Sequence, residues 1–158
     1  MKKEIYIAGG CFWGVQKYFD SVNGVLQTTV GYLNSNMENP TYQDVCSKKT
    51  NAVEAVHIIY DDDVILLFEL IDHWMSIIDP FSVNKQGNDV GTQYRTGIYT
   101  KDNIERELMR SYLLDLQKNF NKPLAIEVKL IENYYLAEEY HQKYLEKNPN
   151  GYCHIKLK

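Results

Sequence analysis

The segment Glu4-Ile5-Tyr6-Ile7-Ala8-Gly9-Gly10-Cys11-Phe12-Trp13-Gly14 decides how the chain begins to fold. Its first five residues form a short, mostly apolar run that ends at two glycines, and this pattern predicts a buried strand over 4–8. Apolar residues then recur at the helical spacing i, i+3, i+4 and i+7, as Val15, Tyr18, Phe19 and Val22. A helix is therefore predicted from about Phe12, and Cys11 lies at the turn between this strand and this helix.

The rest of the chain alternates single predicted strands with single predicted helices. Strands are predicted where β-branched and aromatic residues gather or alternate, over 25–32, 56–60, 94–99 and 125–131. Helices are predicted over 66–78, from Thr100 or Asp102 to about Asn119, and over 137–147. A long irregular loop is predicted over 81–93. This order favours an α+β fold, a two-layer α/β sandwich with a mixed, largely antiparallel sheet, a ferredoxin-like core and an irregular C-terminal tail.

Length and composition limit the classes of protein to consider. With 158 residues, of which 44% are hydrophobic, the chain can bury one sizeable core, and we expect a single, monomeric domain over 1–158. Lys and Arg number 17 against 21 Asp and Glu, and no long basic run is present, so we expect no nucleic-acid partner. The longest apolar run, 64–68, is far shorter than the roughly 20 residues of a membrane-spanning helix.

The three cysteines, at positions 11, 46 and 153, give an expectation about the compartment. They are too few for a disulfide framework, and no two are close enough in sequence for a zinc knuckle. The apolar stretch after Lys2 and Lys3 is also too short for the hydrophobic part of a secretion signal, which needs about 7 to 15 residues. We therefore expect a cytoplasmic protein whose thiols react.

Cys11 has a setting that suits a reactive thiol. The backbone N–H groups and the positive end of a helix dipole can stabilise a thiolate at the start of a helix, and the thiolate is the nucleophilic form. The flanking glycines let the backbone approach a ligand closely, and Phe12 and Trp13 offer an apolar wall beside the sulfur. Taken alone, these residues are equally consistent with a small, buried, inert thiol.

The segment 10–14 resembles the signature of the methionine sulfoxide reductase A family, enzymes that reduce oxidised methionine. Other segments resemble motifs of the same family in the same order, so the resemblance covers essentially the whole chain. These segments are Val30-Gly31-Tyr32, Asn39-Pro40-Thr41-Tyr42, Val45-Cys46, Glu54-Ala55-Val56, Gln86-Gly87-Asn88-Asp89, Gly91-Thr92-Gln93-Tyr94-Arg95, Ala137-Glu138-Glu139-Tyr140-His141-Gln142 and Asn148-Pro149-Asn150-Gly151-Tyr152-Cys153.

The resemblance implies reduction of the S epimer of methionine sulfoxide, free or in proteins. Cys11 would attack the sulfoxide sulfur and be left as a sulfenic acid. Glu54 would be the proton donor, and Tyr42 and Tyr94 would donate hydrogen bonds to the sulfoxide oxygen. Asp89 maps onto an ordered polar loop of the family. Without the resemblance, an exposed carboxylate, two packing phenols and a turn residue would be the ordinary interpretation of these four side chains.

The resemblance also implies a substrate pocket and a proton source. Phe12 and Trp13 map onto the pocket for the methyl group of the substrate. The sulfoxide oxygen must leave as water, so the site needs a proton. A carboxyl group can supply it if partial burial raises its pKa, and two phenols can hold the oxygen as negative charge develops.

Cys153 is the candidate resolving cysteine, in a segment 148–158 that we expect to be mobile. Its thiol would attack the sulfenic acid to give a disulfide between Cys11 and Cys153, which thioredoxin or another external dithiol would reduce. We expect no bound cofactor. We also expect no metal site, because no histidine pairs with another ligand at metal-site spacing. Cys46 is predicted to be a buried structural thiol.

The histidines are predicted to lie at the surface or at an edge of the fold. His57 and His73 are predicted at the surface or at an edge, and His141 on the solvated face of a helix.

The chain departs from the family pattern at three places. Thr50-Asn51-Ala52-Val53 stands where a Gly-His pair is usual before the glutamate, Asn34-Ser35-Asn36 stands where paired glycines are common, and Ile78 stands where a His often precedes Asp79-Pro80. Two rival functions follow from the residues. One is a thiol enzyme that reduces peroxide, and the other is a non-catalytic module that binds methionine-bearing partners.

Overall fold

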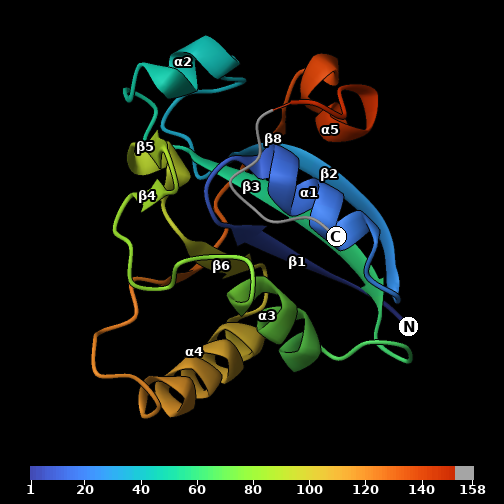
Figure 1. The fold of residues 1–158 in the computed structure, drawn as a ribbon, viewed down its shortest axis with the longest axis vertical. Coiled ribbons are helices and arrows are strands. Elements are labelled where there is room, and N and C mark those ends of the chain that lie inside the picture. The colour runs from blue at the N-terminus through green and yellow to red at the C-terminus, as the bar shows by residue number, and fades with distance from the viewer. Residues whose placement is uncertain (152–158) are drawn as a thin grey trace.

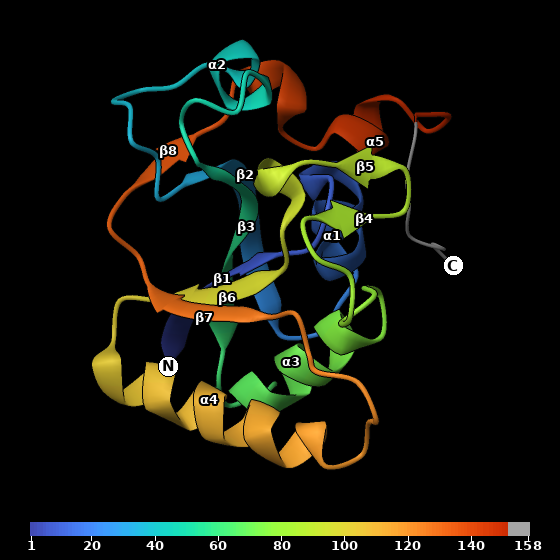
Figure 2. The ribbon, with the colours of Figure 1, turned by 90° about the vertical axis from the view of Figure 1, so that its left-hand side faces the viewer.

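A six-stranded sheet runs through the protein in the order β7-β6-β1-β3-β2-β8 (Figures 1 and 2). The computed structural model describes residues 1–151. All neighbouring strands are antiparallel except β6 and β7, so the expected mixed, largely antiparallel sheet is confirmed. The strands are β1 (Lys2–Ala8), β2 (Val25–Leu33), β3 (Val53–Asp61), β6 (Gly97–Thr100), β7 (Glu127–Leu130) and β8 (Tyr134–Leu136).

Three helices cover one face of this sheet, which makes the two layers (Figure 1). They are α1 (Phe12–Asp20), α3 (Leu67–Met75) and α4 (Asn103–Gln117). Two short helices, two 3-10 turns and a hairpin complete the described part, namely α2 (Tyr42–Cys46), α5 (Tyr144–Lys147), η1 (Thr92–Tyr94), η2 (Glu139–His141) and β4–β5 (Lys85–Gln86 and Asp89–Val90). In Figure 2, α2, α5 and β5 lie near one end of the sheet, and α3 and α4 near the other. No helix within 1–151 has both the length and the apolar character needed to cross a bilayer.

The alternation of side chains along β3 decides which residues face the helices. Val56 and Ile58 are fully buried in the core that also contains Phe19 and Trp74 of the helices. The odd-numbered positions, such as Ala55, lie in a smaller cluster on the other face. Because side chains alternate along a strand, Glu54 points to the same face as Val56, under the helices.

His57 is not at an edge, contrary to the expectation from the sequence. Its strand β3 is paired on both sides, with β1 and β2. The imidazole stacks on the ring of Tyr6 at 4.3 Å, and Nε2 lies 3.2 Å from the Glu4 carboxylate. The half-buried ring therefore contributes to packing on the face opposite the three long helices.

The strand expected over 94–99 begins only at Gly97. Tyr94 instead lies in the 3-10 turn η1. The side chain of Arg95 explains the difference, because its guanidinium donates to the carbonyl oxygen of Thr92 at 2.9 Å and to that of Asn51 at 3.1 Å. These bonds hold the chain away from the sheet before the strand starts.

The helix expected over 137–147 is wrong, because tertiary contacts override the local helical pattern. Lys143 adopts a left-handed conformation, with φ 56°, which interrupts a right-handed helix. Its amide donates to Gln16 Oε1 at 2.8 Å, and its ammonium lies 2.7 Å from Asp20. The Gln142 side chain bonds to the backbone of Val30 on β2.

The packing at Gly31 of β2 yields a test of this fold. A Cβ atom there would lie 2.5 Å from the ring of Tyr134 and 2.7 Å from the carbonyl oxygen of Tyr135. We expect Gly31→Ala to lower the free energy of unfolding by about 1–3 kcal/mol, since neighbouring groups must shift to admit the methyl group. Urea denaturation measures the change. Ser111→Ala on the exposed side of α4 is the control, and equal stability of the two variants would contradict the packing described.

Candidate active site

Cys11 stands at the turn between β1 and α1, as the sequence predicts. Gly10, just before it, has φ 83°, a left-handed conformation that favours glycine. Cys11 itself is the N-cap residue of α1 and is 7% exposed. The sulfur is therefore carried on the residue that opens the helix, where the partial positive charge of the helix dipole favours an anion.

Glu54 lies on β3, beneath the start of α1. Its Oε1 accepts a hydrogen bond from the backbone N–H of Phe12 at 3.3 Å, so the carboxyl group touches the residue next to Cys11. The residue is 1% exposed, and Oε2 has no hydrogen-bond partner within residues 1–151. Burial raises the pKa of Glu54 to about 8, and the nearby charge of Asp89 adds to the rise. The carboxyl group is therefore mostly protonated at neutral pH.

Tyr42 and Tyr94 approach the same carboxyl group from two different segments. Tyr42 is the first residue of α2, and Tyr94 is the last residue of η1. Burial raises the pKa of both phenols, and the charge of Glu54 raises each further. Both phenols stay protonated at neutral pH and can donate hydrogen bonds.

Asp89 reaches this group from the β4–β5 hairpin. The hairpin is tied to the body of the protein by Gln86, whose side chain accepts from the Asp79 amide and donates to the Asp79 carbonyl, each at 2.8 Å. The Asp89 charge raises the pKa of Glu54 and that of Tyr94. The structure thus brings the four predicted residues Glu54, Tyr42, Tyr94 and Asp89 close enough together for the charges of the two carboxylates to shift the pKa values of their neighbours.

Phe12 and Trp13 have different surroundings. Phe12 is 1% exposed, and its ring lies against Tyr32 with a centroid distance of 5.9 Å. Trp13 is half-buried, stacks on Tyr144 at 3.7 Å, and donates from Nε1 to His141 Nδ1 at 2.9 Å. Of the two rings predicted to line the methyl pocket, only Trp13 is partly open to solvent.

His141 is not on a solvated helix face. It is 1% exposed and sits in η2, where its ring packs against those of Phe12 and Tyr42. The predicted helical period places it outward, whereas the broken chain described above turns it inward.

Glu138 also has a role that its sequence position alone does not indicate. Its carboxylate accepts from the hydroxyl of Tyr32 at 2.8 Å and from the backbone N–H of Tyr42 at 3.0 Å. Glu138 therefore fixes the start of α2, and with it Tyr42. The only signal in the sequence is that it belongs to one of the family-like segments.

Cys46 is exposed rather than buried, so that prediction is wrong. It is the last residue of α2, a single surface turn of which only Val45 is buried. Its thiol interacts with the hydroxyl of Tyr42, so it borders the candidate site. Cys153, the predicted resolving residue, lies outside the described residues.

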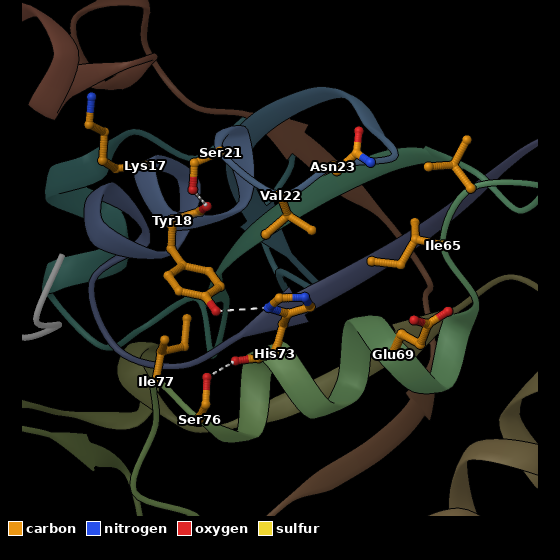
Figure 3. Close-up of a pocket in the computed structure, with 11 residues that line it drawn as sticks. Lys17, Tyr18, Ser21, Val22, Asn23, Ile65, Glu69, His73, Ser76 and Ile77 are labelled. Atoms are coloured by element: carbon orange, nitrogen blue, oxygen red, sulfur yellow. Dashed lines mark hydrogen bonds between the residues drawn. The ribbon is translucent and has the colours of Figure 1, made fainter. Parts of the chain in front are cut away.

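Two other features of the described part lie apart from this group. A cavity of about 740 Å³ lies between α1 and α3, where the Tyr18 hydroxyl is 2.8 Å from Nδ1 of the half-buried His73, and no predicted site residue from the described range lines it (Figure 3). Within 1–151, the only potential metal ligands grouped closely enough are Asp61, Asp62 and Asp63, and these carboxylates bind the amino group of Met1.

The burial of Glu54 predicts how stability depends on pH. A carboxyl group whose pKa rises from 4.5 to about 8 on folding binds its proton more tightly in the native state. Wild-type stability should therefore fall, relative to Glu54→Gln, as pH rises from about 4.5 to 8. We expect a relative loss of as much as about 4 kcal/mol, measured by urea denaturation across this range. Glu139→Gln, at a side chain that is 91% exposed, is the control. Parallel profiles for wild type and Glu54→Gln would contradict the burial described.

Known proteins resemble this chain over nearly its full length. It matches the family model described as peptide methionine sulfoxide reductase over residues 3–158. A relative from Malacoplasma penetrans (strain HF-2), described as peptide methionine sulfoxide reductase MsrA, is 59% identical over 158 residues, which are 100% of this chain and 99% of the relative.

Solved structures agree with this match. Reduced Mxr1 from Saccharomyces cerevisiae is similar with a TM-score of 0.91 and 34% identity, over 99% of this chain and 92% of that chain. A structure of Mxr1 in complex with Trx2 is similar with a TM-score of 0.64 and 21% identity, over 90% of this chain and 84% of that chain, a likeness of fold. The chain belongs to the peptide methionine sulfoxide reductase A family.

Proposed function

We propose that this protein reduces the S epimer of methionine sulfoxide, free or in proteins, to methionine, with Cys11 as the nucleophile. The observation that supports this most directly is the buried Glu54 carboxyl group beside the helix start that Cys11 caps. Its pKa of about 8 keeps a proton available at neutral pH, at the place where the sulfoxide oxygen needs one.

The chemistry assigned to these residues balances atom by atom. The Cys11 thiolate attacks the sulfoxide sulfur while Glu54 protonates the oxygen, which Tyr42 and Tyr94 hold by hydrogen bonds. The protonated oxygen then passes to the Cys11 sulfur while the bond between the two sulfurs breaks and its electron pair stays with the substrate. Cys11 is left as a sulfenic acid, and the substrate leaves as the thioether methionine. Asp89 keeps the proton on Glu54 by raising its pKa further, and the Trp13 ring, with Phe12 behind it, lines the side that takes the methyl group.

A second thiol must then remove the sulfenic acid. We assign this step to Cys153, whose sulfur bonds to that of Cys11 as water leaves. A dithiol protein of the thioredoxin type then reduces the disulfide by exchange. The complex of the relative Mxr1 with Trx2 supports this partner class.

The proposal extends to the setting in which this chemistry occurs. We propose one catalytic domain over 1–158, acting as a monomer in the cytoplasm without a bound cofactor or metal. The six-stranded sheet, with all three long helices packed into one core on its face, supports the single domain.

Turnover of the two sulfoxide epimers tests the proposed reaction. With dithiothreitol as reductant, we expect the S epimer to be consumed and the R epimer to persist. Chiral chromatography measures the amount of each epimer. Cys11→Ser should lower the rate by at least about a thousandfold, because no other group supplies the nucleophile. Full activity of Cys11→Ser would exclude the assignment.

Turnover of hydrogen peroxide, compared with turnover of the sulfoxide, and binding of sulfoxide peptides separate the two rival functions from the proposed one. A peroxide-reducing enzyme would turn over hydrogen peroxide faster than the sulfoxide. A binding module would retain methionine sulfoxide peptides without consuming them. Either result with the wild-type protein would replace the proposed function.

The resolving role of Cys153 is tested by changing the reductant. We expect Cys153→Ser to form about one methionine per chain, and to lose thioredoxin-supported turnover by at least about tenfold, since no disulfide forms for thioredoxin to reduce. Dithiothreitol should still support turnover, because it can reduce the sulfenic acid directly. Cys46→Ser is the matched control and should keep thioredoxin-supported turnover. The reverse pattern would assign the resolving step to Cys46.

A further inference from the structure

We propose that His141 is a positioning residue of this site. Its imidazole fixes the direction of the Trp13 indole and itself packs against the ring of Tyr42. The inference rests on the proposed function, because the direction of the Trp13 ring affects turnover only if that ring lines the substrate site.

His141 lies among aromatic rings from two distant segments and from its own turn. Its ring centroid lies 5.3 Å from that of Phe12, 4.6 Å from that of Tyr42 and 4.1 Å from that of its neighbour Tyr140. With 1% of its surface exposed, the imidazole fills the space between the start of α1 and the start of α2. It therefore connects the residue proposed for the methyl side of the substrate with one proposed for the oxygen side.

The hydrogen bond between Trp13 and His141 determines the protonation of the imidazole. An indole N–H only donates, so Nδ1 of His141 must accept through its lone pair. The neutral ring then carries its proton on Nε2, which has no hydrogen-bond partner within residues 1–151. Burial lowers the pKa of His141, against the opposing effect of the Glu138 charge, and this favours the neutral ring. The bond to Trp13 is thus the single described hydrogen bond that orients this ring.

The stacking contact of Trp13 with Tyr144 is less directional than its hydrogen bond. Tyr144 stacks on the indole at 3.7 Å with 13° between the ring planes. Stacked rings can slide and rotate in their planes at little cost, whereas a hydrogen bond weakens steeply as its angle departs from linear. Tyr144 therefore sets the plane of the indole, and His141 sets its direction within that plane.

Two conservative substitutions at position 141 separate the two ring nitrogens. In His141→Asn, the amide oxygen can occupy the place of Nδ1 and still accept from Trp13. In His141→Gln, the amide nitrogen occupies the place of Nε2 and no acceptor remains at Nδ1. We expect the Gln variant to lose on the order of five- to tenfold in kcat/KM for the S sulfoxide, mainly through a higher KM. The Asn variant should stay within about twofold of wild type.

A double-mutant cycle tests whether the effect passes through Trp13. In a Trp13→Phe background the donor is absent, so His141→Gln should have no further effect on KM. The rate at which iodoacetamide labels Cys11, followed by peptide mass spectrometry, should be the same in the wild-type, His141→Asn and His141→Gln forms, because the inference concerns Trp13 and not the nucleophile. His73→Gln is the matched control, at a half-buried histidine that bonds to Tyr18 beside the separate cavity of Figure 3, and its KM should equal that of wild type.

The outcomes separate this inference from the proposed function. A wild-type protein that does not turn over the S sulfoxide would overturn both. A wild-type protein that turns over, with equal KM for the wild-type, Asn and Gln forms, would overturn the inference alone. Equal losses for Asn and Gln, or an undiminished loss for His141→Gln in the Trp13→Phe background, would show a purely structural role and would also overturn it. Circular dichroism confirms that each variant is folded.

Discussion

The hydrogen bond from the Phe12 amide to the buried Glu54 carboxyl group is the contact on which the site depends. It joins the central strand β3 to the start of α1, and so fixes the acid and the residue beside the nucleophile together. Burial favours the protonated carboxyl group, while this bond favours the charged one. Their balance keeps the pKa of Glu54 near 8. The group is therefore protonated at neutral pH, yet its pKa is close enough to that pH for the proton to be released during a reaction.

Around this bond, the fold brings together segments that are distant in the chain. Tyr42 comes from α2, Tyr94 from η1 and Asp89 from the β4–β5 hairpin, and each is held by contacts away from the carboxyl group itself. Glu138 holds α2 through the Tyr42 amide, and Arg95 ties η1 to the carbonyl oxygen of Asn51, three residues before Glu54. The oxygen-bearing side chains can therefore stay close in spite of their mutual repulsion when charged.

The sequence predicts the long elements well and the short ones poorly, for a physical reason. The signals for β1, β2 and α4 lie within the elements themselves. β1 is an apolar run that ends at glycines, β2 is rich in β-branched and aromatic residues, and α4 begins at the capping residue Asp102. The segment 137–147 has an apolar period typical of a helix, but Gln142 bonds to β2 and the left-handed Lys143 bonds to α1, and the chain leaves the helical course there. Once the predicted helix is broken, the exposed position predicted for His141 is lost as well. Burial at such places depends on partners more than 100 positions away, which no local pattern contains.

In two of the three departures from the family pattern, an asparagine adopts the backbone conformation that favours glycine. Asn34 and Asn51 lie in the two segments where glycines are usual, and they have φ values of 54° and 55°. This left-handed conformation favours glycine, but asparagine tolerates it better than other side chains because its amide can bond locally. The chain can thus keep the backbone course that leads into β3. Ala52, in the segment where a Gly-His pair is usual, is 1% exposed and packs in the core, so this position contributes apolar contact beside the acid. The altered segment therefore preserves the two properties on which Glu54 depends, a fixed backbone and the exclusion of water.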